Sequence, residues 1–291
     1  MATVGHNRKM LGAECMADML EAYGVTHVFH VPAVLRKTFA VMETRTKIKR
    51  LHVHSEATAA YMADGYARAT GKPGICMAQV IGALNLAAGL RDAWLAHSPV
   101  IAFTGGREPK TKFRQVYQEV DDVPAFEPVT KMNATVDDVT RFPDMVRQAF
   151  RVATTGRPGP VHLQFRGNEG QVDGDEGEME PMVEPEFSHI PPFRPEPDQA
   201  SVMKALQVLQ SATKPVIVAG AVSSTPARAA NWLRSPRRCR FRSSHRSTAR
   251  TRSRACIRCR AVWSAHTLAR APTRSSTRPI SSASSARRRA A

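Results

Sequence analysis

Acidic residues and lysine are missing from the C-terminal segment of the chain. Between Asn231 and Ala291 the sequence has seventeen arginines but no Asp, Glu or Lys. The whole chain of 291 residues has 42 basic and 25 acidic residues, so residues 1–230 hold 25 of each. A net charge of +17 usually suggests a nucleic-acid partner. Here that suggestion applies to the arginine-rich segment alone, because the first 230 residues are neutral.

Long apolar runs are also absent, and cysteines are few. No run approaches the ~20 apolar residues of a membrane span, and the first twenty residues are too broken by charge for a signal peptide. Of the five cysteines, Cys15 and Cys76 stand alone, as buried free thiols do. Cys256 and Cys259 have the spacing of a metal knuckle, but no second pair follows. We therefore expect a soluble, cytoplasmic protein without disulfides or a metal site.

The first 168 residues alternate between apolar strands and helices. The strands are continuously apolar rather than alternating, which is typical of a parallel sheet that helices cover on both faces. The sequence thus predicts an α/β fold. We expect strands at 25–31, 48–53, 74–80, 99–105 and 159–165, and helices at 9–23, 56–70, 82–97 and 144–155.

The character of the sequence changes after residue 168. Residues 169–197 are acidic and contain six prolines, which predicts an extended linker on the surface rather than a packed element. Residues 198–224 then begin a second, incomplete α/β domain, with a helix that Asp198 caps and an apolar strand within 214–220.

Residues 225–291 have the composition of GC-rich coding DNA that is read out of frame. A shifted frame can be written by joining the third base of each codon to the first two bases of the next codon. With synonymous third bases chosen freely, that frame permits a sequence with helices, an apolar strand and a final strand ADLVCFIG. We therefore expect a frameshift near 221–228 and a disordered tail that cannot bury enough apolar surface to fold. The alternative is a genuine nucleic-acid-binding tail, although aromatic residues for base stacking are few.

Glu56 stands at the front of an alanine-rich stretch, residues 54–74 (HSEATAAYMADGYARATGKPG). Ser55 is a suitable N-cap and Gly71 a suitable stop for a helix over 56–70. One explanation for Glu56 is structural, because a carboxylate in the first turn complements the helix dipole. The surrounding residues supply a second explanation.

Five stretches of the chain, all within residues 10–167, resemble the pyrimidine-binding domain of thiamine diphosphate enzymes. The similarity is greatest to the acetolactate synthase-like branch, in order and in spacing. The stretches are HSEATAAYMADGYARATGKPGICMAQ (54–79), IGALNLAAGLRDAWLAHSPVIAFTG (81–105), YQEVD (117–121), VTKMN (129–133) and ATTGRPGPVHL (153–163).

The resemblance implies a catalytic role for Glu56. In this family a glutamate at this point hydrogen-bonds a ring nitrogen of the aminopyrimidine, which promotes loss of the thiazolium proton. The resulting ylide attacks a 2-keto acid, and the ring acts as the electron sink for decarboxylation. The chain is therefore expected to come from a lyase or transferase. The start of an alanine-rich helix suits such a carboxylate, because the chemistry favours a mostly apolar pocket. We therefore expect Glu56 at a strand-to-helix junction, largely shielded from water.

The resemblance also implies cofactor-binding roles for Pro32, Gly82, Asn85 and Gln118. Gly82 and Asn85 match a glycine and an asparagine of a turn that approaches the cofactor. Gln118 matches a glutamine that lines the site, although a surface-loop amide explains it equally well. Pro32 stands in Val-Pro-Ala-Val where acetolactate synthases have Tyr-Pro-Gly-Gly. The loss of both glycines removes a close backbone approach that they permit.

Complete enzymes of this family continue through a central domain into a diphosphate-binding domain. The Gly-Asp-Gly…Asn motif of that last domain holds magnesium and the cofactor's phosphates, and this chain lacks it. We therefore expect residues 1–168 to supply one wall of a thiamine diphosphate site in a homodimer or tetramer, and the chain to be inactive alone. Bound FAD fits the branch, but no residue supports it. The alternative is a non-catalytic α/β binding protein with an arginine-rich, nucleic-acid-binding tail.

Overall fold

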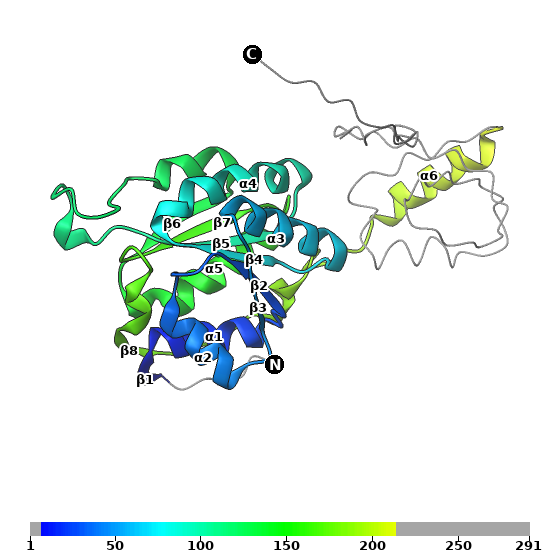
Figure 1. Ribbon diagram of the computed structural model, residues 1–291. Helices are drawn as coiled ribbons and strands as arrows, with labels where there is room; N and C mark the ends of the chain where they lie inside the picture. The colour runs from blue at the N-terminus through cyan, green and yellow to red at the C-terminus, as the bar shows by residue number, and fades with distance from the viewer. Residues whose placement is uncertain (1–6, 214–291) are drawn as a thin grey trace, which may run out of the picture. The chain divides into compact units, whose positions relative to one another are not determined.

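The computed structural model describes residues 7–213, and its centre is a six-stranded parallel sheet (Figure 1). The strands lie in the order β3-β2-β4-β5-β7-β6, and all neighbours are parallel. The predicted parallel α/β fold is therefore confirmed. The sheet consists of β2 (His27–His30), β3 (Lys49–His52), β4 (Gly74–Ala78), β5 (Val100–Gly105), β6 (Met132–Val136) and β7 (Val161–Phe165).

Helices cover both faces of this sheet, as Figure 1 shows. One face carries α1 (Gly12–Ala22), α2 (Arg36–Arg45) and α5 (Phe142–Thr154), and the other carries α3 (Glu56–Thr70) and α4 (Ala83–Ala96). Successive side chains of a strand point to opposite faces. In β4, for example, Ile75 joins the core under α1, α2 and α5, whereas Cys76 joins the core under α3 and α4. This explains why the strands are apolar throughout.

Small residues let α3 and α4 approach closely. A Cβ atom on Gly89 would lie 2.7 Å from both the carbonyl oxygen of Ala57 and the Cβ of Ala60, so glycine is required there. Helix α3 has the bounds that the sequence predicts, and it ends at Gly71 in the left-handed conformation, with φ of 71°. The alanine-rich stretch is therefore the tightly packed half of a helix pair.

The order of the strands creates a switch point at the carboxyl edge of the sheet. From β2 the chain crosses to β3 on one side and then returns to β4 on the other side of β2. The connections after β2 and β3 enter α2 and α3, which lie on opposite faces. In open α/β sheets, ligands bind outside the carboxyl ends of the strands at such a point. The fold therefore predicts that a ligand site is formed by residues that follow β2, β3 and β4.

The segment 169–197 differs from its sequence-based expectation. Strand β8 (Glu176–Met179) pairs antiparallel with β1 (Arg8–Leu11). Three apolar side chains of the segment, Val172, Met179 and Phe187, are buried. The prediction of an extended segment without packed elements is therefore wrong, because a few widely spaced apolar residues anchor an otherwise acidic, proline-rich stretch. The domain boundaries themselves stay a prediction.

The remaining described elements are short turns and one further helix. The short 3₁₀ helices are η1 (Val80–Gly82), η2 (Pro109–Thr111), η3 (Val123–Val129), η4 (Val139–Arg141), η5 (Gln171–Gly174) and η6 (Pro185–Ser188). Helix α6 (Gln199–Ser211) begins where the sequence predicts, and the Asp198 side chain accepts a hydrogen bond from the Ser201 N–H at 2.8 Å. Within residues 7–213, none of the helices has both the length and the apolar character of a membrane span. The strand expected within 214–220, the tail and Cys256 and Cys259 lie outside the described residues.

Candidate functional site

Glu56 is the first residue of α3, directly beyond the end of β3. Its position at a strand-to-helix junction follows the sequence-based expectation, but the side chain is half-buried rather than largely shielded. The side-chain amide of Asn85, in the first turn of α4, donates a hydrogen bond to Glu56 Oε2 at 3.3 Å. One carboxylate oxygen is therefore held by an amide, and the group faces the switch point of the sheet.

Gly82 provides the surface against which this carboxyl group rests. It ends η1, the turn between β4 and α4. A Cβ atom at this position would lie 2.4 Å from Glu56 Oε1 and 2.5 Å from Glu56 Cδ. Any residue other than glycine would therefore displace the carboxylate. The structure brings together Glu56, Gly82 and Asn85, three residues that the sequence analysis selected.

Gln118 is held at the same edge of the sheet by Gln79, a residue that the sequence analysis did not select. The Gln79 side chain, which follows β4, donates from Nε2 to Gln118 Oε1 at 3.0 Å. Gln118 Nε2 in turn donates to the Tyr117 hydroxyl at 3.0 Å, and its backbone has a φ of 61°. Gln79 could have been found from the sequence, because it is the first polar residue after a buried parallel strand.

Pro32 lies apart from this group. It is exposed beyond the end of β2 and lines a hollow of about 500 Å³ on the side of α2. The two arginines of the hollow already have partners: Arg36 pairs with Glu169 at 2.8 Å and Arg50 with Glu43 at 3.0 Å. The residues that line it are His30, Pro32, Ala33, Val34, Arg36, Phe39 and Arg50. They do not include the residues around Glu56.

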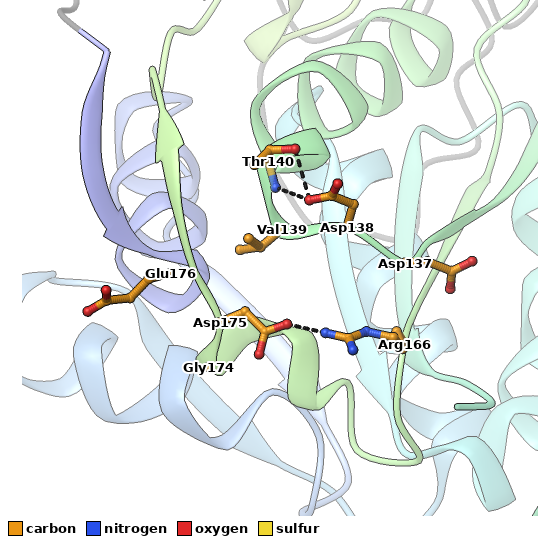
Figure 2. Close-up of a pocket in the computed structure, with 8 residues that line it drawn as sticks. All are labelled: Asp137, Asp138, Val139, Thr140, Arg166, Gly174, Asp175 and Glu176. Carbon is orange, nitrogen blue, oxygen red and sulfur yellow. Dashed lines mark hydrogen bonds and ion pairs between the residues drawn. The ribbon is translucent and has the colours of Figure 1, made fainter. Parts of the chain in front are cut away.

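A second hollow, of about 680 Å³, follows the carboxyl ends of β6 and β7 (Figure 2). Its polar groups mostly stabilise the fold. Asp138 Oδ1 accepts hydrogen bonds from the backbone N–H and the hydroxyl of Thr140, both at 2.8 Å, and Arg166 pairs with Asp175. Within residues 7–213 no group of three His, Cys, Asp or Glu side chains could hold a metal ion.

Lys131 is neither a surface charge nor a residue that faces the group around Glu56. Its ammonium donates to the backbone carbonyls of Val152 and, at 2.8 Å, of Thr155, at the end of α5. Burial lowers its pKa. Lys131 therefore caps a helix C-terminus, where a cation is favourable.

Comparison with known proteins identifies the family of the chain. Residues 10–125 match the family described as thiamine pyrophosphate enzyme, N-terminal TPP binding domain. The chain is 34% identical over 216 residues to a probable acetolactate synthase large subunit of Methanocaldococcus jannaschii. It is 31% identical over 229 residues to the acetolactate synthase isozyme 1 large subunit of Escherichia coli K12.

The chain belongs to the acetolactate synthase-like thiamine pyrophosphate enzymes. The two matches cover 72% and 78% of this chain but only 36% and 40% of the relatives, so the chain spans well under half of their length. The resemblance stated from the sequence is thus confirmed, and membership of this family supports thiamine diphosphate as the cofactor. The roles of the individual residues stay predictions.

Proposed function

We propose that this chain forms the pyrimidine-binding wall of a thiamine diphosphate site, and that Glu56 is its catalytic carboxylate. The main support for the proposal is that the Glu56 carboxyl group lies between Gly82 and the side-chain amide of Asn85, at the switch point of the sheet. In the complete enzyme, the reaction would be decarboxylation and carboligation of a 2-keto acid. We place the protein in the cytoplasm, which fits the free, buried thiols of Cys15 and Cys76 in the described part of the chain.

The residues at this point fit the aminopyrimidine half of the cofactor. Gly82 leaves room for the Glu56 carboxyl group because it has no side chain, and Glu56 is accessible enough to meet a ring nitrogen. The amides of Gln79 and Gln118 offer further donors and acceptors beside it. When bound, thiamine diphosphate supplies a thiazolium ring that serves as an electron sink. Glu56 holds a proton at the pyrimidine nitrogen, and Asn85 fixes the direction of its carboxyl group.

The diphosphate end of the cofactor needs groups that the described domain does not offer. No cluster of acidic or histidine ligands for magnesium exists within residues 7–213. We therefore propose that magnesium and the phosphates are held by the part of the family's enzymes that this chain does not match, and that the chain is inactive alone. No described residue is assigned to FAD.

A second copy of the chain would complete the surroundings of Glu56. Several large apolar side chains are exposed on α3, on α4 and on the η1 turn that precedes α4, which is unusual for a monomeric surface. They are Tyr61, Met62, Ile81, Leu84 and Leu95. We propose that this surface, the α3–α4 face, is the contact of a homodimer or tetramer, and that the contact shields the half-buried carboxylate.

The proposed domain organisation follows the extent of the family likeness. Residues 1–168 form the pyrimidine-binding domain, 169–197 connect it, and 198–224 begin the central domain. Residues 225–291 are read from a shifted frame. The likeness to the relatives over 72–78% of the chain supports a change of sequence character before the C-terminus.

The test of the proposed function is Glu56→Gln in a full-length protein whose reading frame is restored after residue 224. Exchange of the thiazolium C–H proton with solvent should slow by about 100-fold or more, since general acid–base groups contribute ~10²–10⁴-fold. Glu43→Gln, an exposed carboxylate on α2, is the matched control and should leave exchange unchanged. Unaltered exchange in Glu56→Gln would show that this carboxylate does not act on the cofactor.

A further inference from the structure

The loop that carries Gln118 has both of its ends in a buried polar cluster. Residues 106–122 leave the carboxyl end of β5 and return into η3. Gly106 begins the loop and Asp122 ends it, and both are buried. The tip is different: Phe113 is 86% exposed and Tyr117 is 79% exposed. The position of Gln118 therefore depends on how the two ends are held rather than on packing of the tip.

Gln164 of β7 touches both ends of this loop. Its Nε2 donates a hydrogen bond to Asp122 Oδ1 at 2.6 Å. Its side chain also lies against Gly106, where an added Cβ atom would come within 2.4 Å of Gln164 Cγ. Gln164 and Asp122 are each only 2% exposed. One buried amide thus joins the outgoing end of the loop, the returning end and the sheet.

A neighbouring chain of hydrogen bonds fixes the residue after Asp122. Thr104 Oγ1 and His162 Nε2 are 2.7 Å apart, and His162 Nδ1 lies 2.7 Å from Asn133 Oδ1. Asn133 Nδ2 then donates to the Val123 carbonyl at 2.6 Å. Burial lowers the pKa of His162 to about 3, so the ring is neutral, with Nδ1 donating to Asn133 and Nε2 accepting from Thr104. The returning end of the loop is therefore bound to three strands.

We propose that Asp122 and Gln164 are positioning residues, a buried clasp that holds the 106–122 loop so that Gln118 stays against Gln79 at the edge of the sheet. The relevance of the clasp to catalysis rests on the proposed function, because only there does Gln118 face the cofactor. Its physical effect on the loop does not depend on Glu56 or on any bound molecule.

The charge of Asp122 makes the clasp sensitive to pH. Burial raises the pKa of Asp122 to about 6, and Asp121 also raises it, whereas Gln164 and Arg107 lower it. Opening of the loop would expose the carboxyl group to water and return its pKa toward the ordinary value of 3.8. By linkage, the closed loop is favoured when Asp122 is protonated, and it loses that advantage as the pH rises from about 4 to 6.

The experiment is amide hydrogen exchange of residues 109–120 in the full 291-residue chain, corrected for the intrinsic effect of pH. In the wild-type chain the loop should exchange roughly tenfold faster at pH 7 than at pH 5, as the linkage between the two pKa values requires. Asp122→Asn keeps an acceptor for Gln164 but removes the charge. Its loop should exchange slowly, and at the same corrected rate, at both pH values.

Asp121→Asn is the matched control, because it removes an exposed carboxylate that pairs with Arg107 at 3.1 Å. This variant should retain the pH dependence. As a second readout, the side-chain amide signals of Gln79 and Gln118 should shift between pH 5 and 7 in the wild-type chain but not in Asp122→Asn. Equal corrected exchange of the wild-type loop at the two pH values would overturn the clasp, as would persistent pH dependence in Asp122→Asn. Either result would leave the proposed role of Glu56 intact.

Discussion

The cores on the two faces of the sheet are filled by side chains of different sizes. The core under α1, α2 and α5 is filled by large side chains, and Phe142, Phe150 and Met16 among them are fully buried. The core under α3 and α4 is rich in alanine, and a glycine stands where the two helices meet. The outer surfaces show the reverse: α2 exposes charged residues, whereas α3 and α4 expose Tyr61 and Leu84.

This difference separates stability from function within one domain. Large buried side chains supply most of the apolar area that drives folding. The small residues of α3 and α4 instead bring two helix starts close together, which places Asn85 beside Glu56. An apolar outer surface on the same two helices is suited to a partner chain. The face that contributes less to the core is therefore the one on which we propose the site.

The largest effect on stability is expected from Phe150→Ala on the α5 side. The Phe150 ring is fully buried and stacks on Tyr23, with centroids 3.8 Å apart. The free energy of unfolding should fall by about 3–5 kcal/mol, as in other deletions of a buried aromatic ring. Ala60→Gly on α3 is the counterpart, and it should cost only about 1–2 kcal/mol, from helix propensity and the loss of one buried methyl group. Urea denaturation measures both, and equal losses would contradict the difference between the faces.

The smallest effect on stability is expected from Leu84→Asp on α4, where the side chain is 51% exposed. The free energy of unfolding should change by less than about 0.5 kcal/mol, because exposed positions are tolerant. Self-association should nevertheless be lost, because the charge would be buried in the proposed α3–α4 contact. Sedimentation velocity tests this, with Ala40→Asp on exposed α2 as the control. If Leu84→Asp associates like the wild-type chain, the contact lies elsewhere.

Local signals account for the parts of the fold that the sequence predicted correctly. Helix α3 has an N-cap residue, an alanine-rich interior and a glycine stop, all within one stretch. Strand β6 was missed because it is only partly buried and mixes polar with apolar side chains. The pairing of β8 with β1 was also missed, since it joins segments more than 160 residues apart in the sequence. Non-local contacts of this kind leave no periodic signal.

The residues of the candidate site likewise fall into two groups, those that the sequence predicted and those that it did not. Glu56, Gly82 and Asn85 were selected because they match the motifs of one family, and the fold brings them together. Gln79 and the pairing of Gln164 with Asp122 were not selected. The two members of that pair are 42 positions apart. Only the geometry of β7 and of the returning loop makes them neighbours.

The most direct measurement of the central claim is a titration of this chain with thiamine diphosphate, followed by backbone amide NMR. The account predicts that the signals of Glu56, Gly82 and Asn85 shift with added cofactor, and that those of α5 around Phe150 do not. Shifts confined to the α1, α2 and α5 side, or no shift near Glu56 at millimolar cofactor, would contradict the claim that the α3 and α4 side carries the site.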